Sequence, residues 1–104
     1  MHYACYVFDD LDWSHRGEYM EAKHGISVAL ANDAVSDANR VLVDPDYNSE
    51  SGRTVRIIGY SELAAGIITV IAMADGGIDY GVNGWRSNEK DQRIYREAKA
   101  DGQD

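Results

Sequence analysis

Residues 66–74 read Gly-Ile-Ile-Thr-Val-Ile-Ala-Met-Ala and are followed at once by Asp75-Gly76-Gly77. The first stretch is nearly all apolar and rich in β-branched residues, which is typical of a central strand. The two glycines accept the positive φ angles of a tight hairpin turn, so we expect the chain to reverse there. Residues 78–83 then alternate apolar and polar side chains, as a half-exposed partner strand does. We expect Asn83-Gly84 to end that strand.

More strands are expected upstream of this hairpin. Residues 53–60 alternate apolar and polar side chains. Residues 40–43 form a shorter apolar stretch, which Asp44-Pro45-Asp46 closes because proline cannot donate a hydrogen bond to a sheet. Residues 3–8 read Tyr-Ala-Cys-Tyr-Val-Phe and form either a short strand or an extended arm. Together with the hairpin, these segments predict a three- or four-stranded antiparallel meander.

Helix signals stand on both sides of the predicted sheet. Ser14 is a suitable N-cap for a first helix, and Gly25 stands where a left-handed C-cap is wanted. Ser27 then caps a second helix, and Ser87 caps a last helix that runs to about Ala100. The apolar residues of the second helix recur at steps of three and four, which predicts one buried face: Val28, Ala31, Ala34 and Val35.

The order of these segments predicts one α+β domain over residues 1–104. Two N-terminal helices precede the antiparallel sheet, a C-terminal helix follows it, and all helices are expected against one sheet face. A chain of 104 residues fits one domain. Residues 1–10 are the strand or arm, and residues 101–104 are expected to be a frayed tail.

The net charge of −8 argues against a simple nucleic-acid binder, which usually carries a basic face. The charge is unevenly distributed, however. Residues 1–52 carry ten acidic and three basic residues, whereas residues 53–99 carry six acidic and seven basic ones. A basic surface in the second half is therefore possible, and the acidic half suits a basic protein partner.

Several observations favour the cytoplasm. The longest apolar run, residues 67–74, is too short to span a bilayer. Residues 1–5 lack a basic region leading into an apolar one, so no signal peptide is expected. Cys5 is the only cysteine and is expected to be a small buried side chain. The three histidines lack metal-ligand spacing, so neither a metal nor a cofactor is expected.

One segment carries a resemblance to a known family. Trp13-Ser14 followed by Lys23-His24-Gly25-Ile26-Ser27 resembles the opening of BrnT-type toxins of type II toxin–antitoxin systems. Residues 56–59 resemble the family's strand that ends in Ile-Gly, and residues 86–95 resemble its closing basic helix. The resemblance covers roughly residues 13–97.

That resemblance implies a fold like the small RelE-type toxins and cleavage of RNA without a metal. It also implies a cognate antitoxin that neutralises the toxin and supplies DNA binding, and it allows a homodimer. One stretch differs. The family tends to carry Arg-Ile-Ile-Ser-Ala-Arg before its last helix, whereas residues 80–85 read Tyr-Gly-Val-Asn-Gly-Trp. Both arginine positions are non-basic here, and only the following Arg86 is basic.

Metal-independent cleavage uses the adjacent 2′-hydroxyl as nucleophile and needs an acid, a base and cations for the developing charge. A histidine suits the proton transfer, arginines can clamp a phosphate bidentately, and a tryptophan can stack on a base. The candidate catalytic residues are Lys23, His24, Arg53, Arg56 and Arg86, and the candidate substrate-binding residues are Trp85, Lys90 and Tyr95.

Six of the eight candidates also have a structural interpretation. His24, like the lysine before it, can pair with the carbonyls of a helix end. Arg53 and Arg56 can be the solvated side of a strand. Trp85 can be a packed hinge before the last helix, and Tyr95 can face the core. The other cations of the last helix are expected to be surface charges: Arg93, Arg96 and Lys99.

Three functions therefore stay open. The first is a BrnT-like ribonuclease held inactive by an antitoxin. The second is a non-catalytic binding module with the toxin fold, acting with a basic or DNA-binding partner. The third is an acidic, immunity-type protein that mimics nucleic acid, and the capped, strand-rich pattern with its own basic cluster argues against it.

Overall fold

The computed structural model describes residues 11–101. The predicted strand or arm at residues 3–8, Cys5, and residues 102–104 of the expected tail lie outside this range. The elements are α1 (Gly17–His24), α2 (Val28–Val35), β1 (Val41–Val43), β2 (Thr54–Ser61), β3 (Gly66–Asp75), β4 (Ile78–Arg86) and α3 (Glu89–Asp101).

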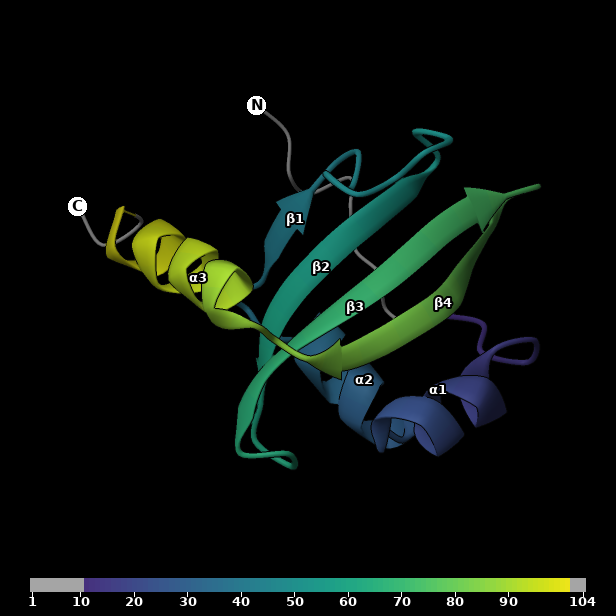
Figure 1. The fold of residues 1–104 in the computed structure, drawn as a ribbon, viewed down its shortest axis with the longest axis horizontal. Coiled ribbons are helices and arrows are strands. Elements are labelled where there is room, and N and C mark those ends of the chain that lie inside the picture. The colour runs from purple at the N-terminus through teal and green to yellow at the C-terminus, as the bar shows by residue number, and fades with distance from the viewer. Residues whose placement is uncertain (1–10, 102–104) are drawn as a thin grey trace.

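The four strands form one antiparallel sheet in the order β1-β2-β3-β4. This is the expected meander, so the α+β class with two helices before the sheet and one after it is confirmed (Figure 1). The predicted turn is confirmed as well, because Gly76 and Gly77 both have positive φ, at 61° and 83°. β4 continues to Arg86, however, so the prediction that Asn83-Gly84 ends it is wrong.

Gly84 serves close packing rather than a turn. It pairs with Val70 in the middle of the β3–β4 ladder. A Cβ atom at this position would stand 2.9 Å from the sulfur of Met20. Glycine lets α1 approach the strand here, and a sequence alone cannot distinguish this role from that of a turn glycine.

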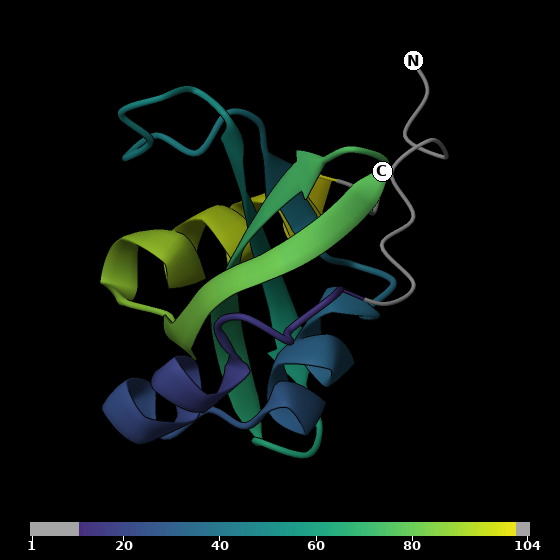
Figure 2. The same ribbon diagram turned by 90° about the vertical axis from the view of Figure 1, so that its right-hand side faces the viewer.

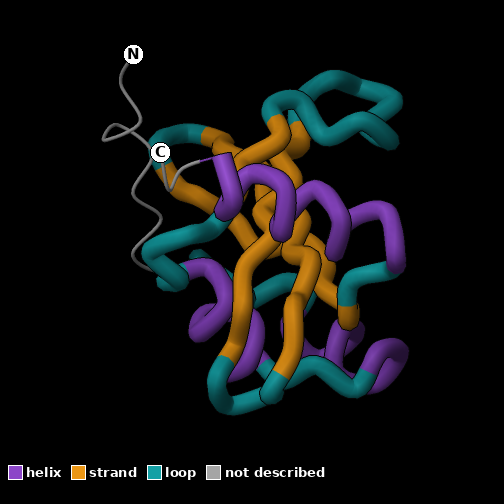
Figure 3. Tube along the Cα trace, turned by 90° about the vertical axis from the view of Figure 1, so that its left-hand side faces the viewer, coloured by secondary structure: helices purple, strands orange, loops and turns teal. Residues whose placement is uncertain are grey.

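The helices cover both faces of the sheet, so the prediction of helices on one face is wrong. Ile57 and Val70 point into the core beneath α1 and α2. Their neighbours Arg56 and Thr69 point the other way and contact Asp91 of α3. Figure 1 shows α3 beside β1, and Figure 3 shows it lying across the strands. Figure 2 shows α1 and α2 side by side and away from α3. Because successive side chains of a strand point to opposite faces of the sheet, each strand contributes residues to both layers.

The apolar core lies between the sheet and the two N-terminal helices. Its fully buried members include Met20, Ile26, Ala31, Ala34, Val35, Ile57, Ile68 and Val70. α2 presses closely on β2, since a Cβ atom at Gly59 would stand 2.0 Å from the carbonyl oxygen of Ala34. The small side chains that α2 turns to the sheet allow this approach, and it orients the whole N-terminal helical pair.

The turn between α1 and α2 forms as the sequence predicts. Gly25 has φ 71° and its N–H donates to the carbonyl of Glu21, and the hydroxyl of Ser27 accepts from the N–H of Leu30. The predicted start of α1 is wrong by two residues, because the N-cap is Arg16 rather than Ser14. The N–H and hydroxyl of Ser14 both donate to the carboxylate of Asp12, at 2.8 and 2.5 Å, and the helix begins only at Gly17.

α3 also begins one residue later than predicted. The side chain of Asn88 accepts from the N–H of Asp91 at 2.9 Å, as an N-cap does. Ser87 is buried instead, and its hydroxyl shares a hydrogen bond with that of Thr69 at 2.6 Å. The prediction of Ser87 as the cap is therefore wrong, because the sheet face uses this hydroxyl.

Candidate functional site

Four of the predicted site residues meet on the α3 side of the sheet, together with a tyrosine that is not among the predicted residues. The rings of His24 and Trp85 have their centres 5.6 Å apart. The guanidinium carbon of Arg56 lies 5.6 Å from the centre of Trp85 and 4.1 Å from that of Tyr47. The ammonium of Lys90 lies 3.9 Å from the centre of Tyr47. We call these five residues the cation–aromatic row.

The row combines segments that are distant in sequence. His24 is the last residue of α1, and the left-handed Gly25 after it turns the chain away. Trp85 is near the end of β4, Tyr47 lies in the connection between β1 and β2, and Lys90 is in the first turn of α3. His24 and Trp85 are half-buried, whereas Tyr47 and Lys90 are exposed. The row therefore offers ring surface and a charge to solvent.

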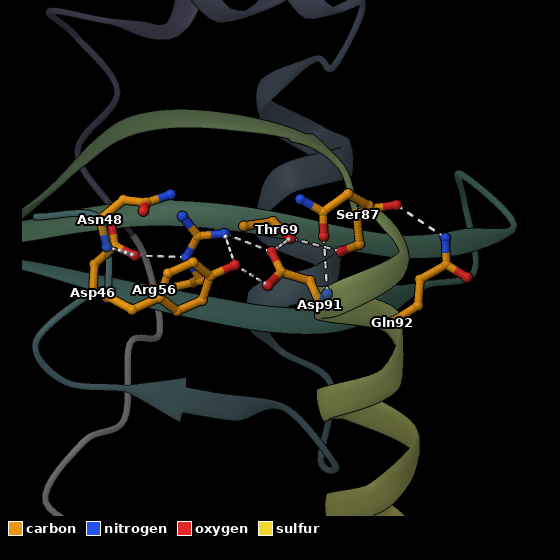
Figure 4. A network of polar contacts seen from close by, with 9 residues as sticks. Asp46, Asn48, Arg56, Thr69, Ser87, Asp91 and Gln92 are labelled. Carbon is orange, nitrogen blue, oxygen red and sulfur yellow. Dashed lines mark hydrogen bonds and ion pairs between the residues drawn. The ribbon is translucent and has the colours of Figure 1, made fainter.

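A buried ionic network fixes the positions of Arg56 and Tyr47 in the row (Figure 4). Arg56 is only 2% exposed, and its Nε and Nη1 donate to Asp46 and Asp91, each at 2.6 Å. The hydroxyl of Tyr47 donates to Asp91 at 2.5 Å, and that of Thr69 donates to the same carboxylate at 2.8 Å. Charged hydrogen bonds of this kind fix side-chain positions strongly. The network thus holds the ring of Tyr47 in place against the guanidinium.

The pKa values in this network are shifted toward the charged forms. Burial acts to lower the pKa of Arg56, but the hydrogen bonds to Asp46 and Asp91 outweigh it and raise the pKa. Burial likewise acts to raise the pKa of Asp91, but hydrogen bonds from Tyr47, Thr69 and Arg56 outweigh it and lower the pKa. Both groups are therefore ionised over the whole neutral range.

Arg56 is placed differently from both sequence interpretations. It is not on a solvated strand face, because α3 and the β1–β2 connection cover it. Two carboxylates already engage its Nε and Nη1 atoms, so a bidentate phosphate clamp through those atoms would have to displace them. Its part in the row is to position Tyr47.

Two other predicted residues lie on exposed surface away from the row. Arg53 is exposed and stands 4.0 Å from Asp75 at the hairpin end of the sheet. Lys23 is exposed on α1, and its ammonium lies 5.7 Å from the ring centre of Tyr19. Within residues 11–101, no hydrogen bond, ion pair or cation–ring contact joins either side chain to the five residues of the row.

The last two predicted residues are on the other flank of α3. Arg86 donates from Nη1 to the carbonyl of Ala64 at 3.2 Å, near the β2–β3 connection. Tyr95 is 5% exposed, and its hydroxyl donates to Asp37 at 2.5 Å. Burial, followed by this hydrogen bond, raises the pKa of Tyr95 well above its ordinary value. Its structural interpretation as a core-facing residue fits this environment, and stacking on a substrate does not.

The sequence carries almost no signal for three residues of the row and its supporting network. Asp46, Tyr47 and Asp91 lie 10, 9 and 35 residues from their common partner Arg56. Such contacts depend on how the β1–β2 connection and α3 are placed over the sheet. The only hint is that Asp46-Tyr47 interrupts a strand-rich region with polar residues.

The arrangement combines three chemical capacities. Histidine is the side chain that exchanges protons near neutral pH, and His24 is tilted by 52° against Trp85. Trp85 is half-buried and Tyr47 is exposed, and aromatic side chains are the groups on which bases stack. Lys90 adds a positive charge beside Tyr47. A proton-transfer group, ring surfaces and a cation are the parts that single-stranded nucleic acid chemistry needs.

Comparison with known proteins adds no family: the chain matches no family model and no curated protein. Within residues 11–101, no helix is both long and apolar enough to cross a membrane. In the same range, no three histidine, cysteine or acidic side chains gather closely enough to hold a metal ion.

Proposed function

We propose that this chain is the toxin of a bacterial type II toxin–antitoxin pair, a cytoplasmic, metal-independent ribonuclease neutralised by its cognate antitoxin. The observation that carries the proposal is the contact of His24 with Trp85 and of Lys90 with Tyr47, two pairs that Arg56 links through its contacts with both rings. The resemblance of residues 23–27 to BrnT-type toxins points to the same chemistry. It also favours a homodimer, which sedimentation would measure.

In the proposed reaction, RNA lies across the row with bases stacked on Trp85 and Tyr47. His24 takes the proton of a 2′-hydroxyl, whose oxygen attacks the adjacent phosphorus. The bond from phosphorus to the 5′ oxygen breaks, and solvent returns a proton to that oxygen. The products are a 2′,3′-cyclic phosphate and a 5′-hydroxyl end. Lys90 offsets the charge that develops on the phosphate oxygens.

The charges around the row predict an unusual salt dependence. Arg56 is already neutralised by two carboxylates, which leaves Lys90 as the exposed cation of the row. Binding through stacking and about one phosphate contact gives a shallow decrease of affinity with salt, with a log–log slope of about −0.7. A conventional basic RNA-binding surface would show a much steeper slope.

The two described histidines provide a matched test. His24 and His15 each lie 5.6 Å from an aromatic ring, of Trp85 and Tyr80 respectively. We expect expression of the wild-type chain to arrest growth and the purified protein to cleave RNA. His24→Ala should reduce cleavage by about 10²–10⁴-fold and restore growth, whereas His15→Ala should change neither.

Two results would contradict the proposal. One is normal growth, together with intact RNA, when the wild-type protein is abundant and folded. The other is equal residual cleavage by the His24→Ala and His15→Ala proteins, which would indicate a contaminating nuclease.

A second candidate function, a non-catalytic binding module, is favoured by the charge distribution. Residues 1–52 carry seven more acidic than basic residues, and exposed acids on α1 include Glu18 and Glu21. Such a surface suits a basic, DNA-binding partner. Under this alternative, the chain forms a stoichiometric complex with the product of a neighbouring gene and the wild-type protein turns over no RNA.

A further inference from the structure

A separate hollow of about 500 Å³ opens on the other flank of α3, between this helix and the β2–β3 connection. Its volume is within the range of roughly 300–1,000 Å³ that small-molecule sites occupy. The residues that matter for its chemistry are Tyr60, Arg86, Gln92, Arg96 and Lys99. None of them belongs to the cation–aromatic row.

Helix geometry explains why this hollow is distinct from the row. Successive residues of an α-helix are about 100° apart. Asp91 points into the sheet and Lys90 lies toward Tyr47, so Gln92 is turned to the opposite flank. Arg96 and Lys99 follow Gln92 by four and seven residues and share its side of the helix. Arg96 and Lys99 are expected from the sequence to be surface charges, and the fold brings Arg86 of β4 up to them.

The positive charge in this hollow is largely uncompensated. Arg86 donates to the carbonyl of Ala64, and Arg96 donates from Nη2 to the side chain of Gln92 at 3.1 Å. Over the described range 11–101, neither guanidinium forms an ion pair with a carboxylate. Lys99 interacts electrostatically with Asp37, so the two arginines supply the charge available to a ligand.

An aromatic ring stands at the same hollow. Tyr60 is 41% exposed, although its backbone N–H is held by the carboxylate of Asp37 at 2.8 Å. Two arginines suit the planar, bidentate recognition of a phosphate, and an exposed ring beside them suits stacking on a base. An acidic peptide would use the arginines but would leave the ring without a partner.

We propose that this hollow binds a nucleotide, with its phosphate on Arg86 and Arg96 and its base on Tyr60. The inference is independent of RNA cleavage at the row. It applies to a free nucleoside monophosphate and to the terminal nucleotide of a strand, which present the same phosphate and base.

The test is an NMR titration of the ¹⁵N-labelled full-length protein. Its probes are inorganic phosphate, adenosine monophosphate, adenosine, a short oligoadenylate with a 5′-phosphate and a hexaglutamate peptide. We expect the two phosphate-bearing adenine probes to shift the amide signals of Gly66, Ser87 and Arg96 at lower concentration than phosphate alone. Adenosine should produce no comparable shift, and the relative affinity of the mononucleotide and the oligomer identifies the source of the nucleotide.

Variants assign the binding to this hollow. Arg86→Gln and Arg96→Gln should each weaken the binding of adenosine monophosphate about tenfold, because each variant removes one charged hydrogen bond to the phosphate. Tyr60→Leu should weaken the binding of the mononucleotide but not the binding of inorganic phosphate. Arg93→Gln is the matched control, because Arg93 is exposed on α3 but does not line the hollow, and it should bind as the wild type does.

Several outcomes would overturn the inference. These are no shift with either phosphate-bearing adenine probe at millimolar concentration, equal weakening by Arg93→Gln, and tighter binding of hexaglutamate than of adenosine monophosphate. Arg96 makes only a hydrogen bond with its neighbour on the helix surface, so Arg96→Gln tests the site even if Arg86→Gln disturbs folding. His24→Ala should leave nucleotide binding unchanged, which separates a failure here from a failure of the proposed ribonuclease.

Discussion

The two faces of the sheet are closed by opposite kinds of chemistry. Under α1 and α2, buried apolar side chains such as Met20, Ile57 and Val70 fill the core. Under α3, the central contact is the ionic network of Arg56 with Asp46 and Asp91. Apolar packing is non-directional and tolerates small shifts, whereas charged hydrogen bonds demand defined positions. The first face supplies stability, and the second positions the residues exposed at its edge.

The largest expected effect is the removal of the cation from the ionic face. Arg56→Met leaves Asp46 and Asp91 buried without their partner and should lower the free energy of unfolding by about 3–5 kcal/mol. Urea denaturation at pH 7 measures this loss. The matched variant combines Arg56→Met with Asp46→Leu and Asp91→Leu, and most of the stability should return. A single variant as stable as the wild type would contradict the importance that we assign to the network.

A loss of about 3 kcal/mol is expected on the apolar face from Met20→Ala, because the side chain is fully buried and leaves a cavity. This loss should be the same at low and high salt. Glu21→Ala, an exposed change on the same helix, should stay within about 0.5 kcal/mol of the wild type. A salt-dependent effect of Met20→Ala would break the contrast between the faces.

A smaller loss of stability is expected at acidic pH, and it should arise from the ionic face rather than from the apolar face. The pKa of Asp91 is lowered in the folded protein, so the unfolded chain binds more protons. The stabilisation is complete above the unfolded value of about 3.9 and is lost as the pH falls through the lower folded value. Urea midpoints between pH 7 and pH 3 should therefore decrease less steeply for Asp91→Asn than for the wild type. Equal slopes would refute this assignment.

The smallest expected effect compares two serines at helix starts. Ser27→Ala removes the hydroxyl that accepts from the N–H of Leu30 and should cost about 1 kcal/mol. Ser14→Ala should cost less, because Ser14 is exposed and bonds only to Asp12 outside the helix. Thermal denaturation of both variants under the same conditions measures the difference. A larger loss for Ser14→Ala would restore it as the cap of α1.

Much of the architecture follows from local patterns in the sequence. The Gly76-Gly77 turn, the apolar β3 strand and the Gly25–Ser27 connection depend on residues within a few positions of one another. Backbone preferences and the alternation of side chains act at that range, so these features can be predicted from the sequence alone. The ends of helices and strands are harder to predict, because Ser87 and Gly84 make tertiary contacts instead of capping a helix or ending a strand.

The candidate sites depend on a longer range. The sequence by itself determined the α+β order and the residue types that suit RNA chemistry, including His24, Trp85 and Lys90. Only the tertiary structure decided that Tyr47 and Arg56 join them, and that Arg86 faces a different hollow with Arg96. The physical reason is that α3 crosses the second face of the sheet. The ion pair that ties this helix to the sheet joins Arg56 and Asp91, which are 35 positions apart, and no local pattern encodes such a contact.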